Sequence, residues 1–379
     1  MQIAAYYFPN YHVDKRNEEY HGANWTEWEL MKCARPRFAG HRQPRIPLWG
    51  YEDEADPQVM AKKIGTAKNY GVDAFIFDWY WYDQNSYLQR ALDEGFLPAV
   101  KGKDFKFALM WANHDWYDRH PAGFENAKMD NCKLLYKCDI TPENITEVWD
   151  HLIERYFASE NYWKIDGKLY FSIYSPRLFI ARMGGVAQAA KALEELRNRV
   201  SRAGLPELHL NAVMYDNLDS APECSMEMRQ EQSSIMGIDS FTNYNWSGTS
   251  NEWTKFPVVD NRQAAAEFLE IIKRNMKIAA GKYYPVITTG FDASPRTIQS
   301  DVFREGVYPF VPVMESEPES FAQALEDYAR LLPDKPAADR IIFINAWNEW
   351  TEGSYLEPDD KLGFAMLEKL KRFKEKISG

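Results

Sequence analysis

The chain has 379 residues, and its 45 Lys and Arg against 56 Asp and Glu leave a formal net charge of −11. With 45% hydrophobic and 27% charged residues, the composition is that of a globular protein and excludes a disordered chain. The acidic balance argues against nucleic acid or an anionic membrane surface as a partner, because both require clustered positive charge. The aromatic fraction is 15%, more than a core of this size obviously needs.

Eight short apolar runs predict the strands of a sheet. Each run is almost continuously apolar, which is typical of parallel strands buried on both faces rather than of strands with one solvated face. The runs are 2–8, 72–78, 106–111, 168–174, 208–214, 238–243, 285–291 and 340–346.

Helical patterns fill the intervals between these strands. Asp56 and Pro57 open an apolar-periodic run with an N-cap and a first-turn proline. Thr141 with Pro142 opens another helix, and Asn261 is expected to cap a third. Further helices are predicted at 86–99, 184–203, 225–235, 318–331 and 361–376. Eight strands alternating with helices predict an α/β fold, a single (β/α)8 barrel that spans residues 1–379 as one domain.

The connections between these elements are unequal in length. Most segments that run from a helix to a strand are short, whereas several that run from a strand to a helix are long. In a β/α barrel the strand-to-helix loops build the active face, and long loops are usually functional. The sequence therefore predicts the site where the strands end, beside the loops 9–55, 112–140, 244–260 and 292–317.

Polar and aromatic residues gather at these predicted strand ends. Flat apolar rings beside hydrogen-bonding groups suit sugar rings, whose C–H faces are apolar and whose edges carry hydroxyls. The alternative for any single ring is packing beneath a loop. The candidate substrate-binding residues are Tyr6, Tyr7, Asp78, Trp79, Tyr80, Trp111, Asn113, His114, Asn243, Tyr244, Trp347 and Asn348.

Two glutamates directly after the last strand are the catalytic candidates. Glycoside cleavage needs one carboxyl to protonate the leaving oxygen and another to act as nucleophile or base. Glu349 and Glu352 are three residues apart, so in a helical turn they share one face and can enter one pocket. Repulsion and partial burial would raise the pKa of one of them, as a general acid requires. Such pairs are also common on solvated helices, but here Trp347 and Trp350 flank them, which is not a solvated composition.

The sequence also predicts what the protein lacks. No apolar run approaches ~18 residues, so no segment is expected to insert into a membrane. The N-terminus is already strand-like, without a basic segment and apolar core, which predicts a cytoplasmic protein unless a leader was removed. The four cysteines are too few for a disulfide scaffold and show no zinc-site spacing, so neither a metal nor another cofactor is expected. The oligomeric state stays open.

Several motifs resemble one known family. The closing segment Asn345–Gly353 reads NAWNEWTEG and is followed by YLEPD at Tyr355–Asp359. The N-terminal segments Ala5–His12, Asn24–Trp28 and Arg35–Pro47 agree with the same family. Together they resemble the WbsX-like family, bacterial proteins labelled glycosyltransferases but similar in sequence to glycoside hydrolase family 99. The motifs bracket nearly the whole chain.

This resemblance implies a (β/α)8 barrel that cleaves α-linked, mannose-type glycans with retention of configuration. Family 99 enzymes carry a Glu-Trp-x-Glu element, which Glu349-Trp350-Thr351-Glu352 matches. By resemblance, Glu349 is the base that deprotonates the substrate's own 2-hydroxyl, which attacks the anomeric carbon to give an epoxide. Glu352 is the general acid and then the base towards water. The expected partner is thus an oligo- or polysaccharide.

One departure from the family and one residue with two interpretations lie near the expected site. The second strand ends in Asp78-Trp79-Tyr80-Trp81, where relatives often carry a Tyr-His-Tyr-Trp type run, so the sugar that is bound can differ. Glu27, within the Trp25–Trp28 motif, either binds substrate or anchors the first loop through Arg35 or Arg45; anchoring is the favoured interpretation, because buried carboxylates usually pair with nearby arginines.

Two other functions remain open. The family label favours a glycosyltransferase that builds a bacterial surface polysaccharide. Transfer from a nucleotide sugar usually requires a metal or a basic diphosphate site, and the chain has neither an Asp-x-Asp pair nor a glycine-rich phosphate loop. A non-catalytic sugar-binding barrel is the third possibility, and it would suit a site that lacked one of the two glutamates.

Overall fold

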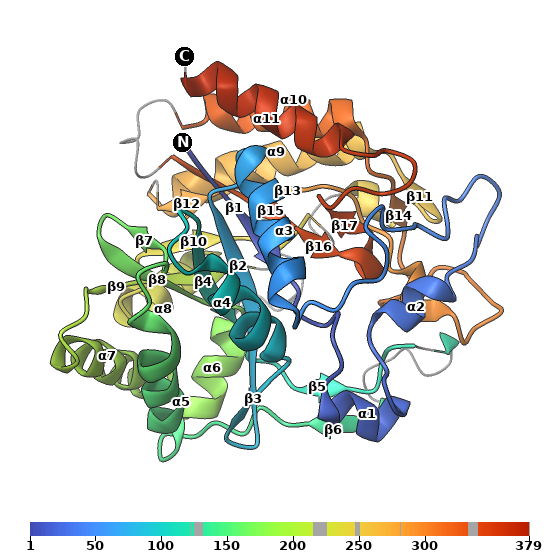
Figure 1. Cartoon of the computed structure of the whole chain (residues 1–379). Coiled ribbons are helices and arrows are strands. Elements are labelled where there is room, and N and C mark those ends of the chain that lie inside the picture. Colours follow the sequence, from blue (N-terminus) through green and yellow to red (C-terminus); the bar gives the residue numbers. More distant parts are fainter. Residues whose placement is uncertain are drawn as a thin grey trace.

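Parallel strands form the centre of the molecule (Figure 1). The computed structural model describes residues 1–121, 123–124, 132–214, 226–246, 251–280, 282–332 and 340–378. The central strands are β1 (Gln2–Tyr7), β2 (Ala74–Tyr82), β4 (Lys106–Trp111), β8 (Lys168–Ile173), β9 (Leu208–Val213), β10 (Ser240–Thr242), β12 (Tyr283–Tyr284), β13 (Val286–Thr288) and β15 (Ile341–Asn345).

These strands close into a barrel. Their hydrogen-bonded order is β12-β10-β9-β8-β4-β2-β1-β15-β13, and neighbours along it are parallel. Only Pro285 separates β12 from β13, and proline has no N–H to give to a ladder. This one interrupted strand pairs with β10 through its first half and with β15 through its second, so it completes the ring. The predicted α/β barrel class is confirmed, and each of the eight predicted strands overlaps an observed one.

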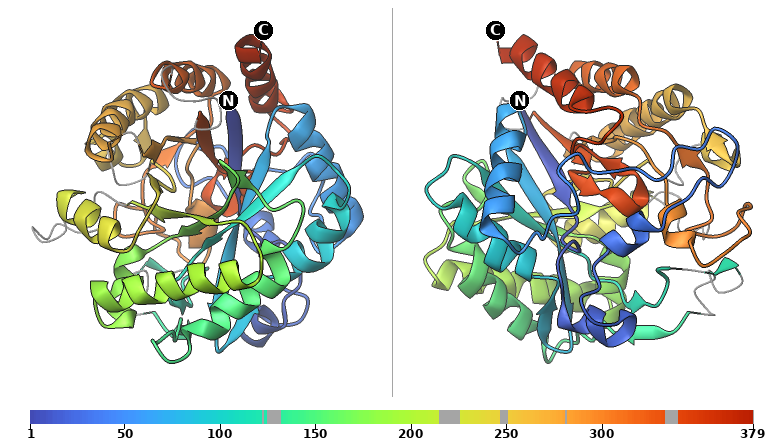
Figure 2. Two further views of the ribbon diagram at one scale, coloured as in Figure 1. Left: turned by 90° about the vertical axis from the view of Figure 1, so that its left-hand side faces the viewer. Right: turned by 45° about the vertical axis from the view of Figure 1, so that its right-hand side comes forward.

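Helices surround the barrel as an outer layer (Figure 2, left). Those that cover the strands are α3 (Pro57–Asn69), α4 (Leu97–Val100), α5 (Ile145–Leu152), α6 (Pro176–Met183), α7 (Val186–Arg202), α8 (Met226–Ile235), α9 (Asn261–Ile278), α10 (Pro318–Arg330) and α11 (Ala365–Ser378). π-helical turns at Ala91–Phe96 and Ile153–Phe157 extend α4 and α5.

Local capping explains where two of these helices begin. The side chain of Asp56 accepts a hydrogen bond from the N–H of Gln58, with Pro57 in the first turn, as the sequence predicts. The cap of α9 is Asp260, which accepts from the N–H of Gln263, and not Asn261, so that prediction was one residue late. Asn261 instead accepts a bond from the Ser320 hydroxyl and thereby ties α9 to α10.

Shorter elements lie mainly in the loops that follow the barrel strands. They include the helices α1 (Lys15–His21) and α2 (Trp28–Lys32) and the strands β3 (Asn85–Tyr87), β5 (Trp116–Tyr117), β6 (Leu134–Tyr136), β11 (Val258–Val259), β14 (Val313–Met314), β16 (Asn348–Glu349) and β17 (Ser354–Tyr355); β7 (Lys164–Ile165) instead precedes β8. In Figure 1, α1, β3, β5 and β6 gather on the side away from the N-terminus. The strand-to-helix loops therefore build one elaborated face, as their length predicts.

One continuous hydrophobic core fills the barrel and the space beneath the helices, and it includes residues from Ile3 to Phe373. All nine residues of β2 are buried, which matches the near-continuous apolar pattern of strands covered on both faces. Among the described helices, none is both long and apolar enough to span a bilayer.

Candidate functional site

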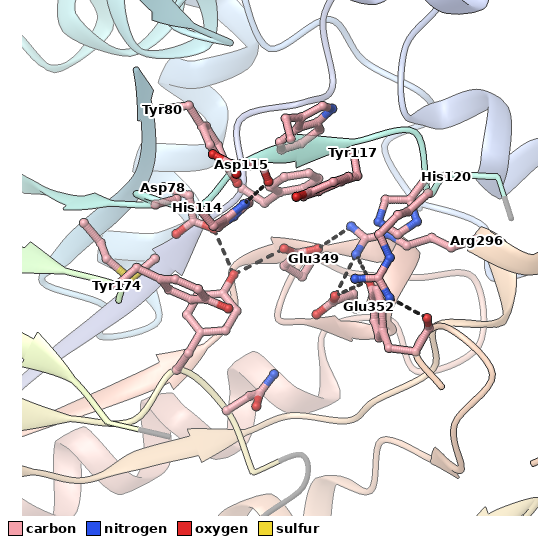
Figure 3. A pocket seen from close by; sticks show the side chains of 18 of the residues that line it. Asp78, Tyr80, His114, Asp115, Tyr117, His120, Tyr174, Arg296, Glu349 and Glu352 are labelled. Atoms are coloured by element: carbon pink, nitrogen blue, oxygen red, sulfur yellow. Dashed lines mark hydrogen bonds and ion pairs between the residues drawn. The ribbon is translucent and has the colours of Figure 1, made fainter. Parts of the chain in front are cut away.

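A cavity of about 800 Å³ opens at the carboxyl ends of the barrel strands (Figure 3). This is the volume of a site for a ligand of several rings. Its lining comes from the ends of β1, β2, β4 and β8, from Tyr244, Asn245 and Trp253, and from the segments 291–312 and 349–352. The cavity is therefore at the face of the barrel where the sequence predicts it.

Glu349 and Glu352 lie at the end of this cavity nearest Arg296. They follow β15 on a hairpin, in which β16 pairs antiparallel with β17 and residues 350–352 form one 3₁₀ turn between them. Asn348 fixes the start of the hairpin, since its side-chain amide donates to the carbonyl of Phe8 and accepts from the N–H of Phe8, both at 2.8 Å. The two carboxyls thus reach one cavity from a single turn, as their spacing predicts.

Gly353 ends this turn at a position that only glycine fits. Its φ is +65°, and a Cβ placed on it would lie 2.7 Å from Cβ and 2.8 Å from the backbone N of Asp292. We expect Gly353→Ala to lower the free energy of unfolding by about 2 kcal/mol or more, through left-handed strain and overpacking together. Urea unfolding measures this change, and Gly102→Ala is the control: its φ is also positive, but nothing lies within 4 Å of the added Cβ. Equal losses in the two variants would contradict the close packing of the turn.

One guanidinium faces three carboxyls in this site. Arg296, on the 3₁₀ turn Ser294–Thr297, lies 2.6 Å from Glu352, 3.4 Å from Glu349 and 3.3 Å from Glu27. All four side chains are buried or nearly so. The guanidinium carries one positive charge, so it can balance only one of these three carboxyls if all of them are ionised.

The environment raises the pKa of Glu349 well above its usual value. Burial is the main cause, and the neighbouring Glu352 carboxyl adds to it, while Arg296 acts in the opposite direction. Glu349 accepts a hydrogen bond from the hydroxyl of Tyr244 at 3.2 Å. The raised pKa is thus that of the carboxyl which the resemblance makes the base, whereas the sequence argument associated a raised pKa with the general acid.

Glu352 is held by a second hydroxyl group. Tyr308 donates to Oε1 of Glu352 at 2.7 Å and also contacts Arg296. Arg296 donates to the same Oε1 at 2.6 Å. These contacts orient the Glu352 carboxyl through one of its oxygens.

Four of the predicted binding residues line the cavity with the two glutamates. On β2, Asp78 and Tyr80 point inward, whereas Trp79 between them points to the other face of the sheet, as side chains of a strand alternate. His114 and Tyr244 complete this group. Burial lowers the pKa of His114, whose Nδ1 contacts the carbonyl of Asp115 at 2.8 Å.

Five predicted aromatic residues are buried in the core and do not line the cavity: Tyr6, Tyr7, Trp79, Trp111 and Trp347. Trp79 and Trp111 face the helices, where the Trp111 ring centroid lies 5.8 Å from that of Trp149 on α5. The Tyr7 hydroxyl contacts the sulfur of Met60 on α3 at 3.3 Å. The contacts of Tyr7 and Trp111 indicate packing between strands and helices, whereas Tyr6 packs against the rings of Tyr244 and Phe343.

Three predicted asparagines connect segments of the barrel instead of lining the cavity. Asn113 exchanges hydrogen bonds with the backbone of Ser175 at 2.8 and 2.9 Å, which joins the loops after β4 and β8. Asn243 donates to the carbonyl of Met214 at 2.6 Å. Asn348 holds the hairpin as described above. Their amides bond backbone groups and, for Asn243 and Asn348, also the side chains of Tyr283 and Glu54, and these contacts hold the lining in place.

Several lining residues were not predicted from the sequence. Arg296 and Tyr308 lie in the long loop after the seventh strand, and Trp116 lies in the long loop after the third. Loop length was the signal for these positions, but it selects no single residue. Tyr174 lies directly after β8, where the predicted strand ended, and was available as a strand-end aromatic residue.

Glu27 anchors the first loop, but through a different arginine than expected. Its carboxyl pairs with Arg296 and accepts from the Thr351 hydroxyl at 2.8 Å, so the predicted pairing with Arg35 or Arg45 was wrong. Arg45 pairs instead with Asp292, at 3.4 Å, as part of a buried cluster. The reason is that Arg45 is engaged by other partners, since it also donates to the carbonyl of Gly353 and pairs with Glu315 at 3.1 Å. His41 and Gln43 contact Asp292 as well, and this cluster lowers the pKa of Asp292.

Within the described ranges, no group of three His, Cys, Asp or Glu side chains is placed to hold a metal ion. The lining of the cavity offers carboxyls, hydroxyls, imidazoles and guanidinium groups beside aromatic rings.

Comparison with known proteins gives relatives of two kinds. The "Uncharacterized protein WxcX" of Xanthomonas campestris pv. campestris (strain B100) is 27% identical over 378 residues, 97% of this chain and 48% of that protein. The chain thus spans about half the length of the curated relatives it matches. Among solved structures, the GH99 endo-alpha-mannosidase from Bacteroides thetaiotaomicron is similar with a TM-score of 0.58 and 16% identity, over 100% of this chain and 97% of that chain.

A "Glycoside hydrolase-like protein" is similar with a TM-score of 0.60 and 12% identity, over 98% of this chain and 93% of that chain. At these identities the structural likeness shows the fold. The sequence match is more specific, because the profile described as "Glycosyltransferase WbsX" covers residues 3–370. The expected family is thereby confirmed: the chain belongs to the glycosyltransferase WbsX family of carbohydrate-active proteins.

Proposed function

We propose that the chain is a retaining glycoside hydrolase that cleaves α-linked, mannose-type bonds of an oligo- or polysaccharide, with the substrate's own 2-hydroxyl as the nucleophile. The observation that carries this proposal is the pair Glu349 and Glu352, which reach one cavity from one turn and share the guanidinium of Arg296. Paired carboxyls around a scissile bond are the requirement of glycoside cleavage.

In the first step Glu349, as a carboxylate, takes the proton of the 2-hydroxyl. The freed oxygen attacks the anomeric carbon while the bond to the leaving oxygen breaks, and Glu352 gives its proton to that oxygen. The products are a 1,2-epoxide and the released alcohol. A raised pKa makes Glu349 the stronger base for this transfer.

In the second step the two carboxyls exchange roles. Glu352 takes a proton from water, which attacks the anomeric carbon, and the epoxide opens. The 2-oxygen recovers its proton from Glu349. Because the anomeric carbon is inverted twice, the product retains the configuration of the substrate.

The surroundings of the pair fit these roles. Arg296 and Tyr308 both contact Oε1 of Glu352, so we assign the transferable proton to Oε2. Aromatic rings beside the carboxyls, among them Tyr80, Trp116 and Tyr174, offer apolar faces to sugar rings. Glycan specificity would then depend on which hydroxyls the polar lining residues contact.

A glycosyltransferase is the second candidate. The family description favours it, and Arg119, Arg177 and Arg182 are among the residues that line the cavity. Guanidinium groups bind phosphates well, so a sugar diphosphate has possible partners there. Arg182 is paired with Asp115 at 2.6 Å.

One experiment separates the two candidates. The protein is incubated with a panel of α-mannans and bacterial O-polysaccharides, with and without UDP- or GDP-sugars. Hydrolysis predicts released reducing ends without any nucleotide sugar. Consumption of a nucleotide sugar that depends on the glycan, with no cleavage in its absence, would make the chain a transferase.

The raised pKa of Glu349 predicts the acid limb of the pH profile. Only the carboxylate form is a base, so kcat/KM should fall as the pH drops through a value above the ordinary 4.5 of a glutamate. In Tyr244→Phe the carboxylate loses a hydrogen-bond donor, which raises the pKa further and should move this limb to higher pH. The profile is measured with an α-mannan at constant ionic strength. A limb at or below 4.5, or a move to lower pH in Tyr244→Phe, would contradict the assignment.

A further inference from the structure

Asp78, Tyr244 and Glu349 form a chain of contacts at the cavity wall (Figure 3). The Tyr244 oxygen lies 2.9 Å from Oδ2 of Asp78 and 3.2 Å from Oε1 of Glu349. Asp78 is 4% exposed, and its other oxygen, Oδ1, is buried without a hydrogen-bond partner among the described residues. Asp78 also lines the cavity, so a ligand bound there can bring a hydrogen-bond donor to this residue.

The number of hydrogens that these three side chains can share limits their protonation states. A tyrosine hydroxyl has one hydrogen to donate, and a carboxylate can only accept. If Asp78 and Glu349 were both ionised, Tyr244 could satisfy only one of the two contacts, and the other would bring two oxygen lone pairs together. Both contacts are hydrogen bonds only if one of the carboxyls carries a proton.

The charges nearby indicate which carboxyl that is. Glu349 is within 3.4 Å of the guanidinium of Arg296, which stabilises a carboxylate. No ion pair of Asp78 occurs within the described ranges, and a buried carboxylate without a cation is costly. Burial raises the pKa of both carboxyls well above their usual values, and only that of Glu349 is opposed by the guanidinium of Arg296.

We propose that Asp78 is a neutral carboxylic acid that donates from Oδ2 to Tyr244, that Tyr244 donates to the carboxylate of Glu349, and that Oδ1 of Asp78 accepts a hydrogen bond from a hydroxyl of the bound sugar. The sugar contact rests on the proposed function, whereas the direction of the hydrogen bonds in the free protein does not. Asp78 would thus be a specificity-determining residue that recognises a hydroxyl without adding a negative charge beside the base.

Infrared spectroscopy of the free protein tests the protonation state without any substrate. The difference between wild type and Asp78→Asn at neutral pH should contain the carbonyl band of a protonated carboxylic acid. Asp115→Asn is the matched control, because Asp115 also lines the cavity but is paired with Arg182 at 2.6 Å; its difference should contain only carboxylate bands. Loss of only carboxylate bands in Asp78→Asn would overturn the proposal.

The sugar contact has its own test in the same spectrum. In the Glu352→Gln background, saturation with an α-linked mannobiose should move the Asp78 acid band to lower frequency, because its carbonyl oxygen gains a donor. A band that stays in place at saturation would overturn the assignment of Oδ1. Absence of mannobiose cleavage by the wild type would count against the proposed function alone, since the band of the free protein is independent of it.

The pH profile gives a further test, in which Asp78→Asn keeps a donor to Tyr244. If Asp78 is neutral in the wild type, the acid limb of kcat/KM should keep its position. If Asp78 is an anion, the substitution removes a like charge and frees Tyr244 for Glu349, so the limb should move to lower pH. Such a move would overturn the proposal. The charged and titratable groups that act on Glu349 here are Glu27, Asp78, Glu352 and Arg296, with the hydroxyls of Tyr11, Tyr80 and Tyr244 nearby.

Discussion

Replacing Glu352 with Gln should lower kcat/KM for an unactivated α-mannan by about 10²- to 10⁴-fold, the usual contribution of a general acid or base. The amide keeps the size of the side chain and an oxygen for Arg296 and Tyr308, but it has no proton to give to the leaving oxygen. With an aryl α-mannoside, whose leaving group needs no protonation, the first step should recover most of its rate. Steady-state rates with the two substrates measure the difference.

Glu349→Gln should be as damaging with the mannan, but the aryl substrate should not rescue it, because the 2-hydroxyl still lacks its base. Glu319→Gln is the control, since Glu319 is exposed on α10 and pairs with Lys369 far from the cavity. It should retain wild-type rates. Equal rescue of both site variants by the aryl leaving group would remove the distinction between base and acid that we assign to these residues.

Replacing Lys63 with Met should lower the free energy of unfolding by about 3 to 5 kcal/mol. The ammonium of Lys63, on α3, lies 2.6 Å from Glu54 and 2.6 Å from Glu357, and all three side chains are at most 4% exposed. Without it, two buried carboxyls face each other with no cation. Urea unfolding at neutral pH measures the loss.

Lys62→Met is the matched control on the same helix. Lys62 pairs with Glu52 at a half-exposed position, so its loss should cost at most about 1 kcal/mol. Loss of Lys63 should raise the pKa of Glu54 above the value of about 7 that it has in the wild type, so the deficit of Lys63→Met should shrink as the pH falls towards about 7, below which Glu54 is protonated in both proteins. A carboxyl whose pKa is higher in the folded state stabilises the fold at low pH, and that stability is lost as the pH rises. A similar loss in both variants at neutral pH would contradict the role of the buried cluster.

The buried cluster around Lys63 also bears on the site, because it holds the residues that precede and follow Glu349 in the sequence. The side-chain amide of Asn348 donates to Glu54 at 2.9 Å, and the indole N–H of Trp350 donates to Glu357 at 2.8 Å. We therefore infer that Lys63 is a positioning residue for the hairpin. All three residues of the segment 348–350 carry polar side-chain groups, yet only Glu349 lines the cavity.

The barrel was predictable from the sequence because its strands are buried on both faces. Continuous apolar runs mark such strands, and even the seventh, interrupted at Pro285, overlapped its prediction. The helices α1 and α2 were missed because they lie inside a long polar loop and are short. Their positions depend on tertiary contacts, such as that of the Trp28 indole with the carbonyl of Glu52 at 2.8 Å.

The location of the candidate site could be predicted from the sequence, but only some of the residues that line it could. The face and the pair Glu349 and Glu352 followed from strand order and spacing. The run after the second strand was treated as uniformly exposed to the site, although alternation sends Asp78 and Tyr80 inward and Trp79 outward. Arg296 had no signal beyond its loop, because its role arises from contacts with Glu27, Glu349 and Glu352, which lie 53 to 269 residues away in the chain.

The most direct test of the proposed chemistry is to follow the first product by ¹H NMR as an α-linked mannan is cleaved. The account predicts that the new reducing end appears first as the α-anomer and then equilibrates with the β-anomer, because double inversion at the anomeric carbon retains configuration. Initial appearance of the β-anomer would contradict participation of the 2-hydroxyl through Glu349 and Glu352.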